Sequence, residues 1–181
     1  MKKLIILAIA AMCAVQSYAQ GTVTFNNAST QVITNSAGAS IPAAGITVGL
    51  YFAPAGTVLE SLFTLQGTTT IAPVPGRFTG GTRALAGIAE GAQAAIQIRA
   101  WSGAFATYEL ASVAAADGVT QIGKSSIFTI TTGSPNGAPP TSPAALAPLT
   151  KFLVATTVPE PSSIALGLLG LGAVSFFRRR K

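Results

Sequence analysis

The chain has few of the residue types that carry most protein chemistry. Its 181 residues include no histidine, one cysteine, one tryptophan and only 9% charged residues. Without histidine, the Ser-His-Asp and Cys-His arrangements of hydrolases cannot form. Cys13 lies in an N-terminal apolar run, so removal of that run leaves no thiol, no disulfide and neither of the commonest nitrogen and sulfur metal ligands. We therefore expect no cofactor and no metal, and a fold stabilised by apolar burial and sheet pairing.

Charge of either sign is scarce in the middle of the chain. The formal net charge is +6, but six of the cations lie at the two ends, as Lys2, Lys3 and residues 178–181. Between Gln20 and Val158, five cations face four anions and leave a net charge of +1. A basic patch for nucleic acid is therefore not expected in this region.

The N-terminus has the three parts of a secretory signal peptide. Lys2 and Lys3 precede the apolar run Leu4–Val15, and small residues flank Tyr18 before the expected cut after Ala19. The run has 12 residues, too few for a bilayer core that needs about 20. An alternative is a lipoprotein signal with Cys13 as the lipidated residue, which Met12 at the preceding position disfavours.

The exported region has the alternating pattern of β-strands. Apolar residues occupy every second position in Gly45–Phe52, near Val23 and Phe25, and at Ile96, Ile98 and Ala100. Further strands are expected at Val58–Leu65, Thr68–Ile71, Ile127–Thr131 and Phe152–Val154. Several short strands with one apolar face must bury those faces together, which predicts an all-β, β-sandwich-like domain.

Three segments depart from this pattern. Thr107–Ala116 is expected to form at most a turn or two of helix before Asp117 and Gly118. Ala84–Ala95 is alanine-rich but contains two glycines, so that a loop and an irregular strand are equally compatible. Five prolines crowd residues 135–148, which predicts an extended surface segment. We accordingly divide the chain into a signal peptide (1–19), a β-sandwich domain (20–134), a Pro-rich segment with a possible last edge strand (135–157) and a C-terminal tail (158–181).

One segment has the spacing of a phosphate-binding loop. Gly118–Ser125 fits the pattern G-x-x-x-x-G-K-S. Such a loop must open a helix, yet the β-branched run that follows at Ser126–Thr131 favours a strand. We therefore interpret the segment as a turn that leads into a strand.

Other candidate sites are few. The carboxylates Glu90 and Glu109 are the pair considered for a weak polysaccharide hydrolase or lyase, although nothing in the sequence makes them convergent. Trp101, and with it Tyr51, could stack on a sugar, but core packing is the commoner use of such aromatics. We expect the protein not to be an enzyme, and the alternative is a carbohydrate-binding module or a weak polysaccharide-acting enzyme.

The C-terminal tail joins three unlike parts. Pro159, Glu160 and Pro161 hold the chain extended, an uncharged run follows from Ile164 to Phe177, and Arg178, Arg179, Arg180 and Lys181 close the chain. The run has 14 residues, or roughly 21 Å of helix, against a bilayer core of about 30 Å. The basic cluster stays on the cytoplasmic side, and its long side chains offset part of the mismatch. This run is expected to be a short transmembrane helix.

In its order and spacing this tail resembles the PEP-CTERM sorting signal. The resemblance covers about 24 residues, with the motif itself at Pro159, Glu160 and Pro161. It implies an exosortase-type processing enzyme, a transient stay in the inner membrane and delivery to the cell surface or extracellular matrix of a Gram-negative bacterium. Family members are often linked to exopolysaccharide and biofilm. With signal peptidase at the other end, the sequence predicts an exported structural protein.

Overall fold

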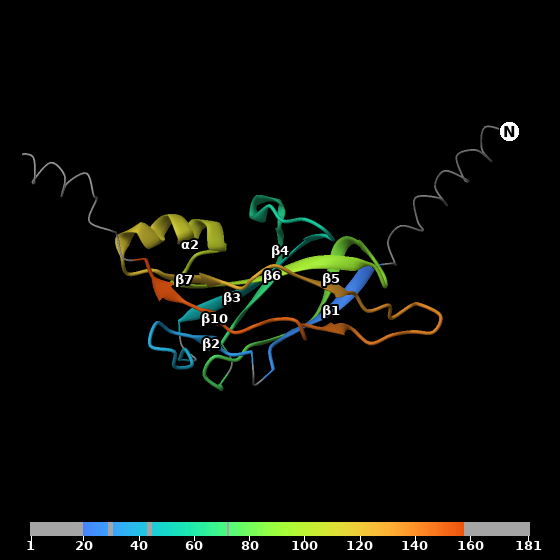
Figure 1. Cartoon of the computed structure of the whole chain (residues 1–181), viewed down its shortest axis with the longest axis horizontal. Helices are drawn as coiled ribbons and strands as arrows, with labels where there is room; N and C mark the ends of the chain where they lie inside the picture. Colours follow the sequence, from blue (N-terminus) through green and yellow to red (C-terminus); the bar gives the residue numbers. More distant parts are fainter. Residues whose placement is uncertain (1–19, 29–30, 43–44, 72, 158–181) are drawn as a thin grey trace, which may run out of the picture.

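The computed structural model describes residues 20–28, 31–42, 45–71 and 73–157 (Figure 1). The predicted signal peptide and the predicted tail, with its cleavage site, motif, apolar run and basic cluster, lie outside these residues. Within them β-strand is the main regular structure and there is one short α-helix, which confirms the all-β class. The strands are β1 (Gln20–Asn26), β2 (Ile33–Thr34), β3 (Ile46–Pro54), β4 (Thr64–Thr70), β5 (Thr79–Ala89), β6 (Gln93–Ser102), β7 (Gln121–Lys124), β8 (Phe128–Thr131), β9 (Ala144–Ala145), β10 (Phe152–Leu153) and β11 (Ala155–Thr156).

The largest sheet is built on the pair β3 and β6. These strands are antiparallel from Ile46 opposite Ser102 to Pro54 opposite Ala94. The sheet has the order β11-β7-β6-β3-β4, and β8 also pairs with β6. A second sheet has the order β5-β1-β9, and β10 pairs with β2.

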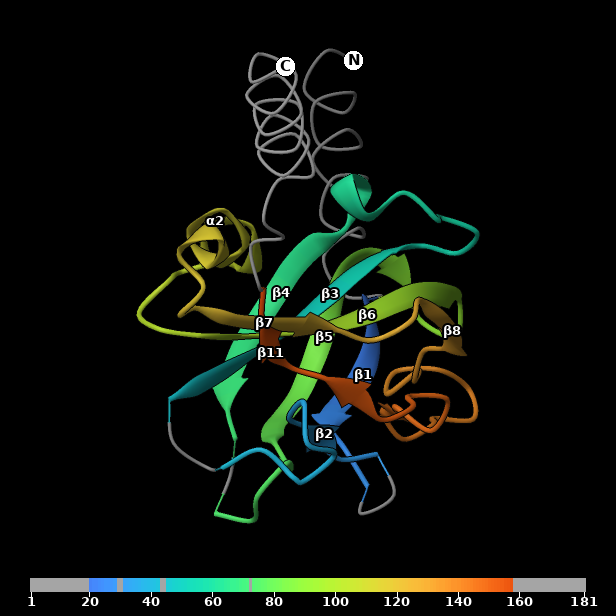
Figure 2. The same ribbon diagram turned by 60° about the vertical axis from the view of Figure 1, so that its left-hand side comes forward.

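The hydrophobic core lies between the two larger sheets. Because strand side chains alternate, Ile96, Ile98 and Ala100 of β6 point to the same side as Val48 and Leu50 of β3. They pack with residues of the second sheet in one cluster. Figure 2 shows β1 and β5 of that second sheet side by side. Val23, Phe25 and Leu85 are the members from β1 and β5 that are fully buried. The alternation predicted for β1, β3 and β6 is thus confirmed.

The predicted helix is present and short. It is α2 (Tyr108–Ala114), continued by the 3-10 turn η3 (Ala115–Asp117). The Thr107 side chain accepts a hydrogen bond from the Leu110 amide at the first turn. The 3-10 turn ends before Gly118, whose φ of 71° is left-handed and costs glycine little.

The expectation of a strand at Val58–Leu65 is wrong over its first six residues. Residues Glu60–Leu62 form a 3-10 turn, η2, and β4 begins only at Thr64. Polar contacts explain the difference, since the carbonyl and carboxylate of Glu60 accept hydrogen bonds from β6 and β7 side chains rather than ladder amides. The sequence of Ala84–Ala95 does not decide between a loop and an irregular strand. In the structure this stretch contains the end of β5, a turn at Gly91 and the start of β6.

The segment with phosphate-loop spacing is a turn that leads into a strand, as interpreted. The Asp117 carboxylate accepts hydrogen bonds from the amides of Val119 and Thr120. Strand β7 follows at once, and no helix begins there. The Asp117 carboxyl has a lowered pKa because the Thr120 and Val119 amides stabilise its charged form.

The Pro-rich segment returns to the body of the fold. Strand β9 pairs in parallel with β1. Leu146, Leu149, Phe152 and Val154 are buried in the main core, and β11 pairs with β7. The predicted last strand is therefore present at Phe152–Leu153, and the described fold extends to the residue where the tail begins.

Candidate functional site

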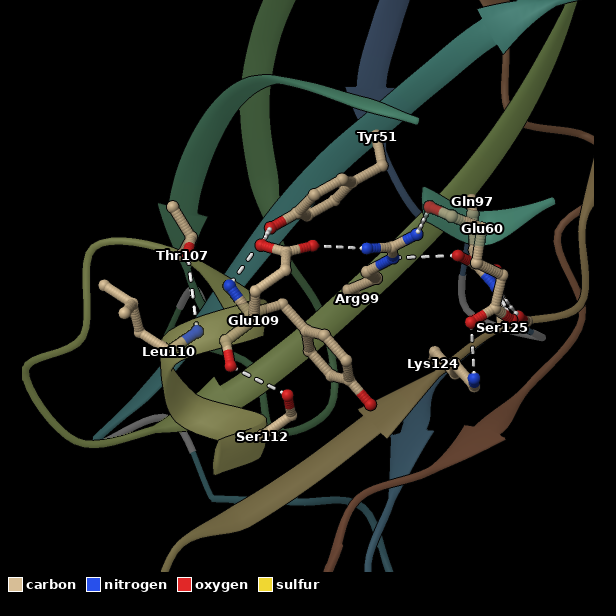
Figure 3. Close-up of polar contacts among 11 residues, drawn as sticks. Tyr51, Glu60, Gln97, Arg99, Thr107, Glu109, Leu110, Ser112, Lys124 and Ser125 are labelled. Atoms are coloured by element: carbon tan, nitrogen blue, oxygen red, sulfur yellow. Dashed lines mark hydrogen bonds and ion pairs between the residues drawn. The ribbon is translucent and has the colours of Figure 1, made fainter. Parts of the chain in front are cut away.

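The outer face of the large sheet carries the main polar cluster of the described residues. Gln97, Arg99 and Trp101 of β6 and Tyr51 of β3 point away from the main core. Instead of facing solvent, they are covered by α2 and by the segment around η2 (Figure 3). A second, smaller hydrophobic cluster results, formed by Tyr51, Ala53, Phe63, Ala95, Trp101 and Ala111.

Arg99 is the centre of this cluster and is only 4% exposed. Its Nη1 atom lies 2.5 Å from Oε1 of Glu109 in α2. Its Nη2 atom donates to the Glu60 carbonyl of η2 at 2.9 Å, and its Nε atom donates to the Gln97 side chain at 2.8 Å. A guanidinium is planar and presents a fork of donors, so one side chain fixes both covering segments to the sheet.

Aromatic rings fill the space around the guanidinium. Its carbon lies 4.1 Å from the ring centroid of Tyr51 and 5.5 Å from that of Tyr108. Such cation–π contacts strengthen as water is removed. The rings also bring apolar area to the outer face, which compensates part of the cost of burying a charge.

Tyr51 extends the network to the start of α2. Its hydroxyl donates to Oε2 of Glu109 at 3.0 Å and accepts from the Tyr108 amide at 3.0 Å. Burial raises the pKa of Tyr51 to about 12, and the neighbouring Glu109 carboxylate adds to the rise. The phenol therefore stays protonated and acts as a fixed donor at physiological pH.

Glu60 links the cluster to β7. Its carboxylate accepts from Lys124 at 2.6 Å and from Gln97 at 3.0 Å. These two donors, Lys124 first, lower the pKa of Glu60. Ser125 lies beneath, where its hydroxyl accepts from the Ile98 amide and donates to the Ser126 carbonyl. Each charged group of the cluster thus has a fixed partner of opposite sign, an arrangement suited to holding structure.

The two carboxylates considered for hydrolysis do not share a site. Glu109 contacts Arg99, whereas Glu90 precedes β6 and accepts hydrogen bonds from Ser134 and Asn136. Glu90 lies just before the first residue of β6, Gln93, and Glu109 contacts Arg99 further along the same strand. At about 3.3 Å per residue, Gln93 and Arg99 are roughly 20 Å apart, whereas the two carboxyl groups of a glycosidase are about 5 to 9.5 Å apart. Among the residues described, no group of three or more acidic, histidine or cysteine side chains could hold a metal ion.

Trp101, the residue considered for sugar stacking, lies in the outer cluster and is 0% exposed. Its indole N–H donates to the Phe105 carbonyl at 2.9 Å, and its ring packs edge-on against Tyr108. Tyr51 is 1% exposed. Neither ring has a free face to offer a sugar, because the covering segments already occupy it.

A separate hollow of about 350 Å³ lies beside the end of β1. The amides of Asn27 and Gln31 at its wall are engaged with backbone carbonyls of the protein itself. Arg77 is the cation of this wall, and it also donates to the Asn27 carbonyl. The polar groups of this hollow therefore hold loops together.

The sequence does not predict the role of Arg99. The signal available was a strand with Gln97, Arg99 and Trp101 on one face and apolar residues on the other. A face that mixes a cation with an aromatic residue is compatible with a covered surface. The partners, however, come from η2 and α2, and only the folded chain shows that they meet.

Comparison with known proteins identifies the tail. Residues 157–181 match the family described as the PEP-CTERM protein-sorting motif. The chain therefore carries this sorting motif, as the sequence predicted, and Pro159, Glu160 and Pro161 lie within the match. No curated protein and no solved structure gives a significant match to the chain.

Proposed function

We propose that this chain is an exported, non-catalytic structural protein of the cell surface or extracellular matrix, sorted through its C-terminal tail. The observation that carries the proposal is the sorting motif at residues 157–181. Such a motif implies export, association with the cell envelope and processing by an exosortase. Signal peptidase at Ala19 and a transient stay of residues 164–177 in the inner membrane of a Gram-negative bacterium complete the proposed route.

The two ends of the described fold support this route. The predicted signal-peptide cut after Ala19 would leave strand β1, Gln20–Asn26, and its pairing with β5 intact. At the other end, the last strand finishes at Thr156, beside the first residue of the motif match. Cleavage near Pro159–Pro161 would therefore remove no strand and no core residue of the described domain.

The domain itself fits a structural role. The core shared by the two larger sheets supports a β-sandwich, and the charged side chains of the polar cluster are paired with one another. The proposed setting is an exopolysaccharide layer or biofilm matrix, to which the domain contributes as a stable folded unit and not as an enzyme.

Sorting is tested by replacing Pro159, Glu160 and Pro161 together with alanine in the producing bacterium. The wild-type chain is expected at the cell surface or in the medium, and the variant is expected to stay in the inner membrane. A chain with Ser162→Ala and Ser163→Ala is the matched control, because it changes adjacent residues and leaves the motif intact. Equal distribution of the motif variant and the wild type would overturn the proposal.

A further inference from the structure

Large exposed apolar side chains are concentrated on one side of the domain. Eight are exposed among the described residues, and six of these lie on or beside η2 and α2. These six form what we term the apolar face: Val58, Leu59, Leu62, Leu110, Val113 and Val119. Val113 and Val119 are the most exposed of the eight, at 79% and 76%.

The two segments that carry the apolar face are fixed to the same side of the large sheet. Arg99 binds Glu109 of α2 with one arm of its guanidinium and the Glu60 carbonyl of η2 with the other. In Figure 1, α2 and the teal turn above β4 both stand on the upper side of the sheet. The outer cluster thus holds both segments, with their exposed aliphatic residues, on the same side of the large sheet.

The chain leaves the domain for its tail from this same side. The Thr157 hydroxyl donates to the carbonyl of Ala115, in the 3-10 turn that continues α2. Ala115 lies in the chain between Val113 and Val119. Seven Cα steps separate Thr157 from Ile164, where the predicted membrane span begins, and they reach roughly 25 Å at most.

From these observations we propose that the apolar face rests on the lipid bilayer while the tail is still attached. This inference depends on the proposed function, since it requires the tail to be inserted. The short connection keeps the Ala115 side of the domain close to the membrane surface, where aliphatic side chains gain by leaving water. The acidic residues of the two segments add little repulsion from the membrane surface, because Glu60 pairs with Lys124 and Glu109 pairs with Arg99. The Asp117 carboxylate accepts hydrogen bonds from its own turn.

The proposal can be tested with spin labels on the full chain in vesicles of phosphatidylethanolamine and phosphatidylglycerol. Cys13→Ser removes the native thiol, and single cysteines are introduced as Val113→Cys, Val119→Cys or Leu59→Cys. Val74→Cys is the matched control, because Val74 is also an exposed valine, at 51%, but lies in the connection between β4 and β5. Collision rates with oxygen, which enters lipid, and with a nickel chelate, which stays in water, report the depth of each label.

The ratio of oxygen to nickel collisions is expected to be at least about threefold higher at Val113 and Val119 than at Val74. Equal ratios in a protein that floats with the vesicles would overturn this inference and leave the anchored tail intact. A protein that does not float with the vesicles would overturn the membrane insertion of the tail, and with it the inference. The two failures are therefore distinguishable.

Discussion

The two faces of the large sheet are both buried, but by different means. On the inner face, Ile96 and Ile98 pack against apolar residues of the second sheet. On the outer face, Arg99 and Trp101 from the same strand lie under α2 and η2 and are also almost inaccessible. Inner burial comes from apolar area alone, whereas outer burial requires a paired charge, ring contacts and directed hydrogen bonds.

This difference separates two tasks within one sheet. Apolar contacts are non-directional, so the inner face holds the sheets together whatever the exact angle of each side chain. The hydrogen bonds of the outer face depend on geometry, so they fix two small segments in set positions. We therefore expect inner-face changes to destabilise the whole domain and outer-face changes to release α2 and η2 first.

The largest effect is expected at the centre of the inner face. Ile98→Ala should lower the free energy of unfolding by about 4 kcal/mol, because it leaves a cavity in a fully buried site. Denaturant titration of the variant measures this loss. Leu110→Ala, at an exposed position of α2, is the control and should change the value by less than about 0.5 kcal/mol. Similar losses in both variants would contradict the assignment of the core.

Arg99→Ala should cost about 3 kcal/mol, because it leaves the Glu109 carboxylate without its cation and removes one of the two donors to the Glu60 carbonyl. Amide exchange should accelerate in residues 108–114 before it does in β1. Arg99→Lys should recover only part of the loss, since an ammonium cannot form the fork. Uniform acceleration of amide exchange across the domain would contradict the expected difference between the two faces.

Alkaline pH should lower the free energy of unfolding by about 2 kcal/mol as the buried Tyr51 phenol loses its proton. Its folded pKa of about 12 lies above the unfolded value of 10.0, so its contribution is complete below pH 10 and is lost as the pH rises toward 12. Unfolding titrations at a series of pH values test this, with Tyr51→Phe as the comparison. If the variant loses as much stability over that interval as the wild type, Tyr51 is not the titrating group.

The smallest effect is expected at Gly49 of β3, which lies opposite Arg99 on the outer face. An added Cβ at Gly49 would lie 3.0 Å from the rings of Trp101 and Tyr51, so Gly49→Ala should cost about 1 to 2 kcal/mol. At Gly67 of β4, the same change meets Arg83 only at 3.4 Å. Gly67→Ala should be close to neutral in a thermal unfolding series, and a larger loss at Gly67 than at Gly49 would contradict the packing described.

The inner face could be predicted from sequence because alternation by itself identifies it, as at Ile96, Ile98 and Ala100. The helix after Thr107 could be predicted equally well, because a capping residue precedes it and a glycine follows its last turn. The outer cluster could not be predicted, because Glu60 and Glu109 are 39 and 10 residues from Arg99 and no local pattern marks them as its partners. The same contact explains why Val58–Leu65, a strand by composition, begins as a turn.

The sorting tail needs no tertiary structure to be recognised, because its parts are contiguous in sequence. Sorting through this tail is tested most directly by the intact mass of the protein from the cell envelope and from the medium. We expect a released form that begins at Gln20 and ends near Pro159–Pro161, and we expect this form to be lost when Arg178–Lys181 are deleted. A form that retains Lys181 in both fractions would contradict processing of the tail.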